Sequence, residues 1–421
     1  MKRTGILLLC VLAGCMLFST ACGDPSTGNK GGATELTIWI QPVNQPEYFM
    51  GWFKSAFEEE HSDITLNFVP QQSSLLSATQ LDIALREKKP DMVATWGATV
   101  VPQLVRGGRL MDLTEVMPED AELEGMALMN RVDGRHYGAP IFGFATPVIY
   151  YNKDVFDANG WSEPTDYQSF VQLCKNITAV RDENNRQKYQ PLTTDSPEHI
   201  MTSLHGKTMT SEELNACMED WSASELPIDN EGFTNGFRWA ADMLANGVFE
   251  TNISGIGSEA VSNFTLQKAL MISMESLDLL DLSYQCTFEI GSFLFPDPPA
   301  QWSSGENDGK VCGIYTDVLC INSNTEFPDA CKKVIEFLYS DEAQEKLFDY
   351  YLYPVKKGIS YENVDPTKKA VFDEAFKPIY DQAAENGMTP YYSEYFHTAL
   401  PANLRSAFNT ISRSPDESTV L

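Results

Sequence analysis

The stretch that most constrains the fold of this chain runs from Asp133 to Phe156 and reads DGRHYGAPIFGFATPVIYYNKDVF. It opens on the tight-turn dipeptide Asp133-Gly134, and Gly138 and Pro140 interrupt regular structure soon afterwards. The run Pro147–Tyr151 is apolar and rich in β-branched and aromatic residues, which predicts a buried strand. A segment with this pattern suits a chain that crosses from one lobe to another.

The size and charge of the chain narrow the classes of protein it can belong to. Its 421 residues are enough for two lobes, and 43% hydrophobic with 21% charged residues is a globular composition. The formal net charge is −29. Such a surface repels nucleic acid and anionic lipid head groups, so we expect neither as a partner.

No sequence motif indicates catalysis or a bound metal. The strings HExxH, CxxC, GxSxG and GxxxxGK[ST] are absent. Gly255-Ile256-Gly257 begins like a dinucleotide-binding fingerprint, but Ala260 stands at its last position and no clear strand precedes it. We therefore interpret this stretch as a loop, and expect no cofactor, no metal and no catalytic residues.

The amino terminus predicts export. Lys2 and Arg3 precede a short apolar core, as in a secretory signal. The sequence Ser19–Gly23 places small residues before Cys22 and resembles a bacterial lipoprotein cleavage box, although Cys15 lies in a competing box. We prefer Cys22 as the lipidated residue, because the residues after it are a Gly/Ser/Asn-rich tether. We thus expect a signal peptide over residues 1–21 and a tether over 22–34.

Six further cysteines stand beyond this anchor. In an exported chain they permit disulfides, with fifteen possible pairings, but they are widely spaced, and buried free thiols are an equal alternative. They are Cys174, Cys217, Cys286, Cys312, Cys320 and Cys331.

The first part of the predicted mature chain alternates strands and helices. Strands are predicted at 36–40, 64–69 and 90–94, with helices at 49–57 and 75–87 and another ending at Gly107-Gly108. Alternation of this kind predicts βαβ architecture with parallel strands. Farther on, the pattern predicts a capping box at Thr165 and Gln168, a mostly helical stretch over 181–262, a strand at 269–274 and a strand pair within 310–321.

Several motifs occur in an order that resembles one family. In chain order they are Phe53–Glu58, Pro90-Asp91, Gly108–Leu113, Gly134-x-x-Tyr137-Gly138-x-Pro140 followed by Tyr151-Asn152-Lys153-Asp154, and Phe337–Gln344. Over about residues 35–410 the chain resembles the extracellular solute-binding proteins of ABC transporters, in the large group that includes the maltose- and oligosaccharide-binding proteins. The small-residue-Met strand at 269–274 is similar too, but Glu275 and Ser276 stand where the family often has Gly and Trp.

The resemblance implies an α/β fold of two lobes, each with a mainly parallel sheet flanked by helices, and a ligand cleft between them. We expect residues 35–143 with 299–338 in the first lobe and 144–298 with 339–421 in the second. It also implies a lipid-anchored, monomeric protein on the outer face of a bacterial membrane, which binds a small solute, by expectation a saccharide, and delivers it to ABC permease subunits.

Candidate ligand-binding residues come from predicted strand ends and crossovers, where aromatic rings could stack on a sugar and polar groups could bond its hydroxyls. Each has an alternative role in core, hinge packing or surface. They are Trp39, Gln41, Trp96, Phe142, Phe144, Glu275, Trp302 and Tyr315.

Two other functions stay open. The same fold could bind a polyamine, peptide or phosphodiester, and Glu275 with the missing Trp at Ser276 motivates the polyamine. An exported hydrolase with a pair of carboxylates is the other alternative, although no spacing of Asp and Glu indicates such a pair.

Overall fold

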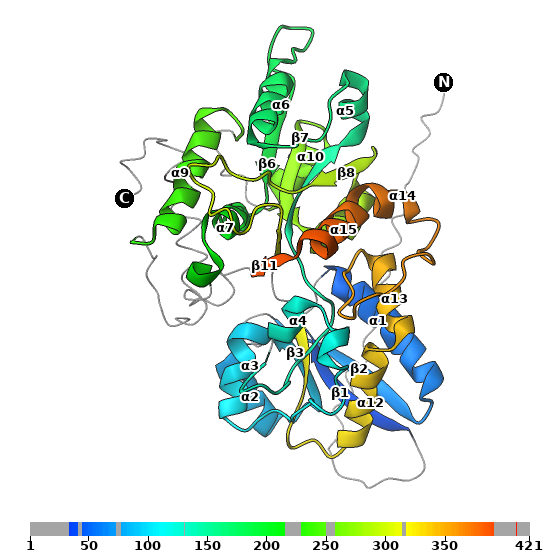
Figure 1. Cartoon of the computed structure of the whole chain (residues 1–421). Coiled ribbons are helices and arrows are strands. Elements are labelled where there is room, and N and C mark those ends of the chain that lie inside the picture. Colours follow the sequence, from blue (N-terminus) through cyan, green and yellow to red (C-terminus); the bar gives the residue numbers. More distant parts are fainter. Residues whose placement is uncertain are drawn as a thin grey trace, which may run out of the picture.

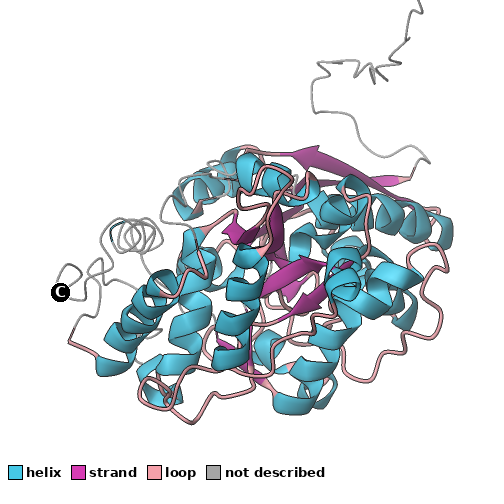
Figure 2. Cartoon of the chain, turned by 90° about the horizontal axis from the view of Figure 1, so that it is seen from above, coloured by secondary structure: helices cyan, strands magenta, loops and turns pink. Residues whose placement is uncertain are grey.

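Two sheets with helices on both faces organise the part of the chain that the computed structural model describes, namely residues 33–40, 44–72, 77–129, 131–214, 229–249, 257–313, 317–390 and 410. Each sheet forms the centre of its own lobe: the first lobe lies at the bottom of Figure 1 and the second at the top. Seen from above, strands lie between helices in the middle of the molecule, and others run along its upper rim (Figure 2). The predicted two-lobed α/β fold is thus confirmed.

The first sheet has five strands in the order β2-β1-β3-β10-β4. The first three are parallel, whereas β10 runs antiparallel to both β3 and β4. Their bounds are Thr34–Ile40 (β1), Ile64–Pro70 (β2), Met92–Trp96 (β3), Ala139–Pro140 (β4) and Asp317–Ile321 (β10). The sequence predicted the three parallel strands, which alternate with helices along the chain.

Helices cover both faces of this sheet because its strands alternate their side chains between two clusters. Leu36 and Ile38 point into a cluster shared with α1 and α12, while Val93 and Val318 point into another shared with α2 and α3. The helices are α1 (Asn44–Glu60), α2 (Ala78–Glu87), α3 (Gly97–Arg106), α4 (Gly125–Met129), α12 (Pro328–Leu338) and α13 (Asp341–Leu347).

The second sheet has four strands in the order β6-β7-β5-β8. Only β6 and β7 are parallel; β5 runs antiparallel to β7 and to β8. The strands are β5 (Pro147–Asn152), β6 (Gln190–Thr194), β7 (Ala269–Glu275) and β8 (Ile290–Phe293). This sheet is therefore mixed, where the sequence predicted a mainly parallel one, because β5 enters it from the crossover in the opposite direction to β6 and β7.

The helices of the second lobe also form two layers. One face of the sheet is covered by α6 (Tyr167–Ala179), α7 (Pro197–Thr208) and α9 (Glu231–Ala245), and the other by α10 (Ser258–Thr265), α11 (Leu279–Gln285), the π-helical turn Phe372–Phe376 and α15 (Lys377–Asn386). Short α5 (Lys153–Asn159) follows β5, and α14 (Lys369–Val371) precedes the π-helical turn.

Local sequence explains where α6 begins. Its capping box is formed by Asp166 and Ser169, one residue later than the predicted Thr165 and Gln168. The Asp166 carboxylate accepts from the Ser169 N–H at 2.7 Å, and the Ser169 hydroxyl oxygen accepts from the Asp166 N–H at 3.1 Å. An aspartate carboxylate caps a helix N-terminus as well as a threonine hydroxyl does. A serine side chain three residues later can accept the reciprocal hydrogen bond from the N-cap N–H, as a glutamine side chain would.

The region predicted as a strand pair separates into two strands with different partners. β9 (Val311–Gly313) pairs in parallel with β11 (Met388–Pro390), whereas β10 inserts into the first sheet. The two are therefore not a hairpin. β11 lies between the lobes in Figure 1.

The packing also bears on the predicted division of the chain. Residues 299–310, predicted for the first lobe, bind the second: the Asn307 side-chain amide donates to the Met209 carbonyl at 2.9 Å, and Trp302 packs on the cluster of α6, α7 and α9. Leu347 and Val355, predicted for the second lobe, lie in the core of the first. Val311 also lies in a core cluster of the second lobe. We therefore propose a lobe boundary between β9 and β10 and a shared segment over 341–355.

A crossover joins the lobes at Gly143 and Phe144. The Gly143 N–H donates to the Tyr353 carbonyl at 2.6 Å, and the ring of Phe144 stacks on the ring of Tyr353 with centroids 4.0 Å apart and planes 4° apart. A Cβ at position 143 would collide with the Pro354 carbonyl oxygen, so only glycine allows this approach of the two backbones. Two segments 210 residues apart in sequence are thus joined between the lobes.

The five cysteines that lie within the described ranges are free thiols, and four of them are buried. Of the two alternatives, disulfides or free thiols, these five cysteines therefore have the second. Cys217 lies outside the described residues. No helix in the described part is both long and apolar enough to cross a membrane.

Candidate functional site

The edge of the first sheet that faces the second lobe is fixed by the crossover. The chain leaves this lobe directly after β4, and Ile141 N–H donates to the Asp317 carbonyl at 3.0 Å, where β10 begins. Asp317 is opposite Trp96, the last residue of β3. Because β1 runs parallel to β3, its last residues, Trp39 and Ile40, end toward the same side.

The facing edge of the second sheet is fixed in the same way. β5 begins directly after the crossover, and its first residue, Pro147, is opposite Glu275, the last residue of β7. Since β6 runs parallel to β7, Asp195 follows β6 at this same edge. Thr146 in the crossover is bonded to Ser276 through both its carbonyl and its N–H, at 2.8 and 3.1 Å.

These two edges approach one another. Leu277, two residues after Glu275, packs against the core of the first lobe, so the turn Ser276–Asp278 contacts the lobe opposite to its own. Strand ends from both lobes therefore face the region between the lobes, and ligands bind outside such strand ends in open α/β sheets. We take this place as the candidate site.

Two predicted aromatic residues belong to the first-lobe side of the site. Trp39 and Trp96 are both partly exposed, and both pack against the same cluster with α2 and α3. Trp96 is also the residue at which β3 ends and α3 begins. An indole with one face held by the core and the other partly exposed can stack on the C–H face of a sugar ring.

The second-lobe side is rich in carboxylates. His199, in the first turn of α7, places its Nε2 3.2 Å from Glu275 Oε1, and both side chains are 20% exposed. The pKa of Asp195 is raised to about 7, chiefly by burial; His199 opposes the rise, and the nearby Asp278 and Glu275 add to it. Asp278 therefore belongs to the same group of charges.

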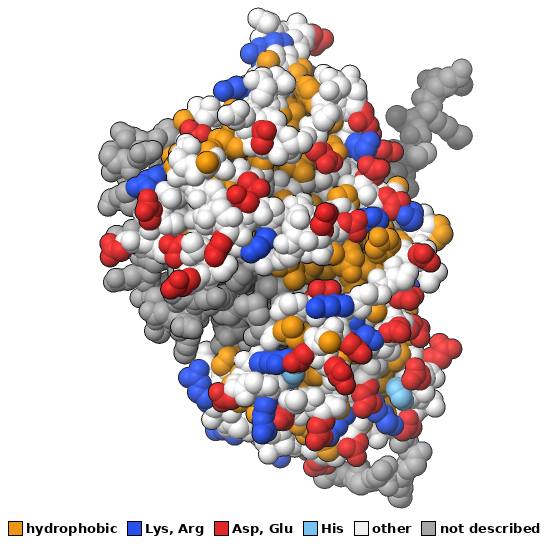
Figure 3. All heavy atoms as spheres, in the orientation of Figure 1, with side chains coloured by type: hydrophobic (Ala, Val, Ile, Leu, Met, Phe, Trp, Pro, Cys, Tyr) orange, Lys and Arg blue, Asp and Glu red, His pale blue; other side chains and the backbone are white. Residues whose placement is uncertain are grey.

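Asp317 adds a carboxylate from the other side. Burial raises its pKa to about 6. Acidic groups thus line both edges of the candidate site, although acidic side chains also lie scattered over both lobes on the face in Figure 3.

Three of the predicted ligand-binding residues have other surroundings. Phe142 is buried in the core of the first lobe, and Phe144 is buried in its stack on Tyr353. Trp302 packs on the second lobe. Buried side chains present no face to a solute, so we withdraw Phe142 and Phe144 as ligand contacts in this conformation. Gln41, Tyr315 and the predicted lipidation site Cys22 lie outside the described residues.

Sequence reasoning missed Asp195 and His199. The stretch 181–262 was expected to be mostly helical, yet it contains β6, which the polar sequence Gln190-Pro191-Leu192-Thr193-Thr194 hides. The signal that could have found it is Ser196-Pro197, a helix start placed directly after a short β-branched run.

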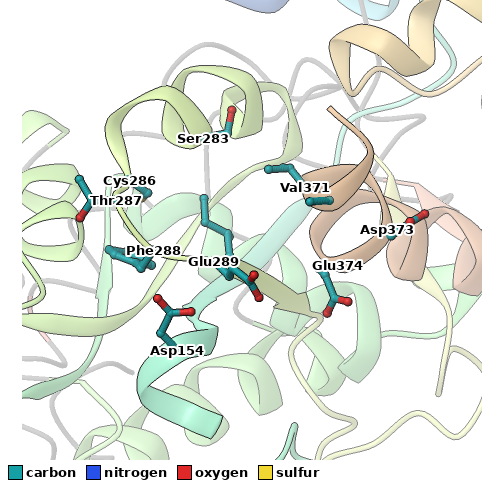
Figure 4. A pocket seen from close by; sticks show the side chains of 11 residues that line it. Asp154, Ser283, Cys286, Thr287, Phe288, Glu289, Val371, Asp373 and Glu374 are labelled. Carbon is teal, nitrogen blue, oxygen red and sulfur yellow. The ribbon is translucent and has the colours of Figure 1, made fainter. Parts of the chain in front are cut away.

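A separate cavity of about 580 Å³ lies at the opposite end of the second sheet. It is lined in part by Asp154, Glu289 and Glu374, and the carboxylates of Glu289 and Glu374 lie on opposite sides of the space in Figure 4. Because Ile290 pairs with Asn152 at the far end of β5 from Pro147, this cavity is distinct from the candidate site. Among the described residues, no group of His, Cys, Asp and Glu is arranged to hold a metal ion.

The sequence was compared with known proteins. A family model described as bacterial extracellular solute-binding protein matches residues 52–372. An uncharacterised ABC transporter extracellular-binding protein of Pyrococcus horikoshii is 25% identical over 179 residues, 42% of this chain and 42% of that protein. A diacetylchitobiose-binding protein of Streptomyces coelicolor is 29% identical over 187 residues, 42% of this chain and 43% of that protein. The chain thus matches less than half the length of these two relatives.

Solved structures show the same fold. The apo form of RafE from Streptococcus pneumoniae superposes with a TM-score of 0.70 at 17% identity, covering 93% of this chain and 97% of that one. A chitin oligosaccharide-binding protein gives a TM-score of 0.66 at 19% identity, covering 91% and 96%. At these identities the likeness concerns the fold.

Proposed function

Because the chain belongs to the bacterial extracellular solute-binding protein family, we propose that it is the solute-capturing subunit of an ABC importer and that its solute is a sugar or oligosaccharide. The family match over residues 52–372 is the observation that carries this proposal. The relative from Streptomyces coelicolor, named for binding diacetylchitobiose, favours a saccharide. So do the two partly exposed indoles, Trp39 and Trp96, at a strand-end site.

Capture proceeds by closure of the lobes on the solute. Each lobe has its own core, so each moves as a unit, and the crossovers between them are the places that bend. The bond from Gly143 to Tyr353 and the stack of Phe144 on Tyr353 hold two of these segments together. Closure then brings the indoles of the first lobe over a solute that is bonded to the polar edge of the second.

The chain performs this task outside the cytoplasm as a monomer, tethered through a lipid on Cys22 and docking on permease subunits. The basic and apolar amino terminus and the small residues before Cys22 support the tether. The solute leaves unchanged: the proposal includes no turnover, in keeping with a family of binding proteins.

The test is a thermal-shift screen of the purified protein against mono- and oligosaccharides, followed by calorimetry for each hit. A ligand at 100 times its Kd stabilises the folded state by about 2.7 kcal/mol, a shift of several degrees. We expect a shift with one class of saccharide, and at least a tenfold loss of affinity in Trp96→Ala. Phe327→Ala, an exposed aromatic at the start of α12, is the control and should bind normally.

A screen in which no saccharide changes the midpoint refutes the sugar assignment. Release of a cleaved product from a labelled oligosaccharide by the pure protein refutes the proposal that it only binds.

A further inference from the structure

We propose that Asp317 binds the solute by accepting hydrogen bonds from hydroxyl groups of a sugar ring that stacks on Trp96. The inference rests on the proposed function, because it names the side chain through which the same site recognises the hydroxyls of a saccharide. It is argued from the place of Asp317 in the first sheet, from the surroundings of its carboxylate, and from a comparison with Asp91 in the same sheet.

Asp317 lies in the middle of the sheet edge that faces the second lobe. It begins β10, directly opposite Trp96, the last residue of β3. On its other side, Ile141 donates its N–H to the Asp317 carbonyl at 3.0 Å, and the Ile141 side chain is buried. Because side chains alternate along a strand, Asp317 lies on the same face of the sheet as Leu319, the face covered by α1 and α12.

Trp96 approaches the same edge from the other face. Directly opposite residues of an antiparallel pair have Cβ atoms about 4.5–5.5 Å apart, so the two side chains start from one place. The indole is partly exposed and packs against the cluster with α2 and α3. A sugar ring that lies across this edge can therefore place its C–H face on the indole and direct its hydroxyls to the carboxylate.

The Asp317 carboxylate has no hydrogen-bond or ion-pair partner within the described part of the chain. Burial is the one cause of its raised pKa, since no donor or cation offsets the loss of water around it. Asp317 nevertheless keeps some exposure, so a molecule between the lobes can reach it. Shielded polar groups are nearly always hydrogen-bonded, and a carboxylate without donors at a ligand-binding edge indicates that the ligand supplies them.

Asp91 shows how the same sheet holds an aspartate that serves the fold. It directly precedes β3, at the opposite end of that strand from Trp96, and is 9% exposed. Its carboxylate accepts from the Thr37 N–H at 2.8 Å and from the Thr325 hydroxyl at 2.6 Å. The first sheet thus contains one aspartate whose donors come from the protein and another whose donors do not.

Hydroxyl groups suit the carboxylate of Asp317. An ionised carboxylate is only an acceptor, and its two oxygens offer about four lone-pair sites, enough for two neighbouring hydroxyls of one ring. Hydrogen bonds to an ionised acceptor are about twice as strong as neutral ones. A solute without hydroxyls would cover the carboxylate and leave it unpaired, which is unfavourable. Asp317 therefore favours a polyhydroxylated solute over an apolar one of the same size.

The experiment measures affinity by calorimetry and stability by urea unfolding, both at pH 7.5, on the purified protein. The probes are diacetylchitobiose, maltotriose, raffinose and xylotriose, with spermidine as a cation that has no hydroxyl. The variants are Asp317→Asn, which keeps the shape of the side chain, and Asp317→Ala, which removes both acceptor oxygens. The matched control is Asp91→Asn, which changes the hydrogen-bonded aspartate of the same sheet.

We expect both Asp317 variants to bind the sugar roughly tenfold more weakly or worse, because bonds to a charged acceptor are lost. Asp317→Asn should unfold at a higher urea concentration than the unsubstituted protein, since it removes a shielded charge that has no partner. Asp91→Asn should do the reverse: it weakens two hydrogen bonds, unfolds at a lower urea concentration and binds the sugar normally. Weaker binding combined with higher stability is a result that a purely structural role for Asp317 does not give.

The contrary results are distinct. Unchanged sugar affinity in both Asp317 variants overturns this inference and leaves saccharide capture standing. So does an Asp317→Asn protein that is less stable as well as weaker in binding, because the carboxylate then supports the fold. Binding of spermidine without any sugar, or silence across all the probes, overturns this inference and the proposed saccharide together.

Discussion

Gly143→Ala tests whether the close approach of two crossovers holds the lobes together. A Cβ at this position would collide with the Pro354 carbonyl oxygen and would lie 3.0 Å from the Pro354 carbonyl carbon and 3.2 Å from the Tyr353 oxygen. All three are backbone atoms, so no side-chain rotation relieves the overlap. The segments must move apart.

The magnitude follows from what that movement disturbs. Overpacking in a closed structure costs about 1–3 kcal/mol. Loss of the 2.6 Å bond from the Gly143 N–H to the Tyr353 carbonyl leaves two buried groups without partners and costs about 1–3 kcal/mol more. Because one displacement produces both effects, we expect a total loss of about 2–4 kcal/mol in the free energy of unfolding.

Urea unfolding followed by tryptophan fluorescence measures the loss, as a lower midpoint at constant slope. Gly51→Ala in α1 is the control, since no atom lies within 4 Å of its added Cβ. Alanine favours a helix over glycine, so this variant should be stabilised by about 0.5–1 kcal/mol. If Gly143→Ala unfolds within about 0.5 kcal/mol of the unsubstituted protein, the crossovers are not held in this contact and the hinge argument fails.

Three further predictions concern buried side chains. Phe144→Ala should lower the free energy of unfolding by about 3–5 kcal/mol because the ring is 2% exposed and stacked on Tyr353; a loss of solute affinity without a loss of stability would instead restore Phe144 as a ligand contact. Asp195→Asn should stabilise the protein at pH 8 by about 2 kcal/mol, and by nothing at pH 3.5, in urea melts across that range. The pKa of Asp195 is raised from 3.8 to about 7, so the folded state holds the extra proton between those values and the stability of the unsubstituted protein falls as pH rises through them; a variant that is less stable at pH 8 would contradict this sign. Iodoacetamide should leave four buried thiols unmodified in the folded protein and modify them in urea, as read by peptide mass spectrometry. Burial both hides these thiols and raises the pKa of each; they are those of Cys174, Cys312, Cys320 and Cys331. Rapid labelling of any of the four in the folded protein would show that its segment opens.

Hydrophobic periodicity predicted most of the first lobe correctly. Strands β1, β2 and β3 and helices α1 to α3 have uninterrupted local patterns, and the sequence predicted them within a few residues. The strand β5 was equally recognisable from its apolar run, and all six of its residues are buried, as that run predicts. Local pattern suffices where one element fills one layer of a core.

Partner choice could not be predicted in the same way. The segments that became β9 and β10 are adjacent in sequence, so a hairpin was the natural expectation, but one pairs with residues 388–390 and the other with β3 and β4. The antiparallel course of β5 in the second sheet likewise depends on the direction in which the crossover delivers it. These outcomes depend on contacts between distant parts of the chain.

The candidate site was partly predictable. The sequence predicts Glu275, Trp39 and Trp96 as strand-end residues, and they lie at the edges that face one another; their contact with a solute stays a prediction. Phe142 and Phe144 were proposed as contacts for their aromatic character, yet the crossover uses both for packing. Asp195 was not predicted as a site residue, because the strand before it, β6, is polar and begins near a proline. No apolar run in the sequence therefore indicates that strand.

The place of β10 in the first sheet governs how that lobe can be made. β4 and β3 flank β10, which lies 177 residues beyond β4 in the chain, counting from Pro140 to Asp317. At 5–20 residues per second, synthesis needs about 9–35 s to cover that span. During this interval β3 and β4 carry unpaired backbone edges, which are templates for association with other chains. A half-sheet that forms before Asp317–Ile321 pairs therefore keeps two open edges, and it closes only when that strand takes its place between β3 and β4.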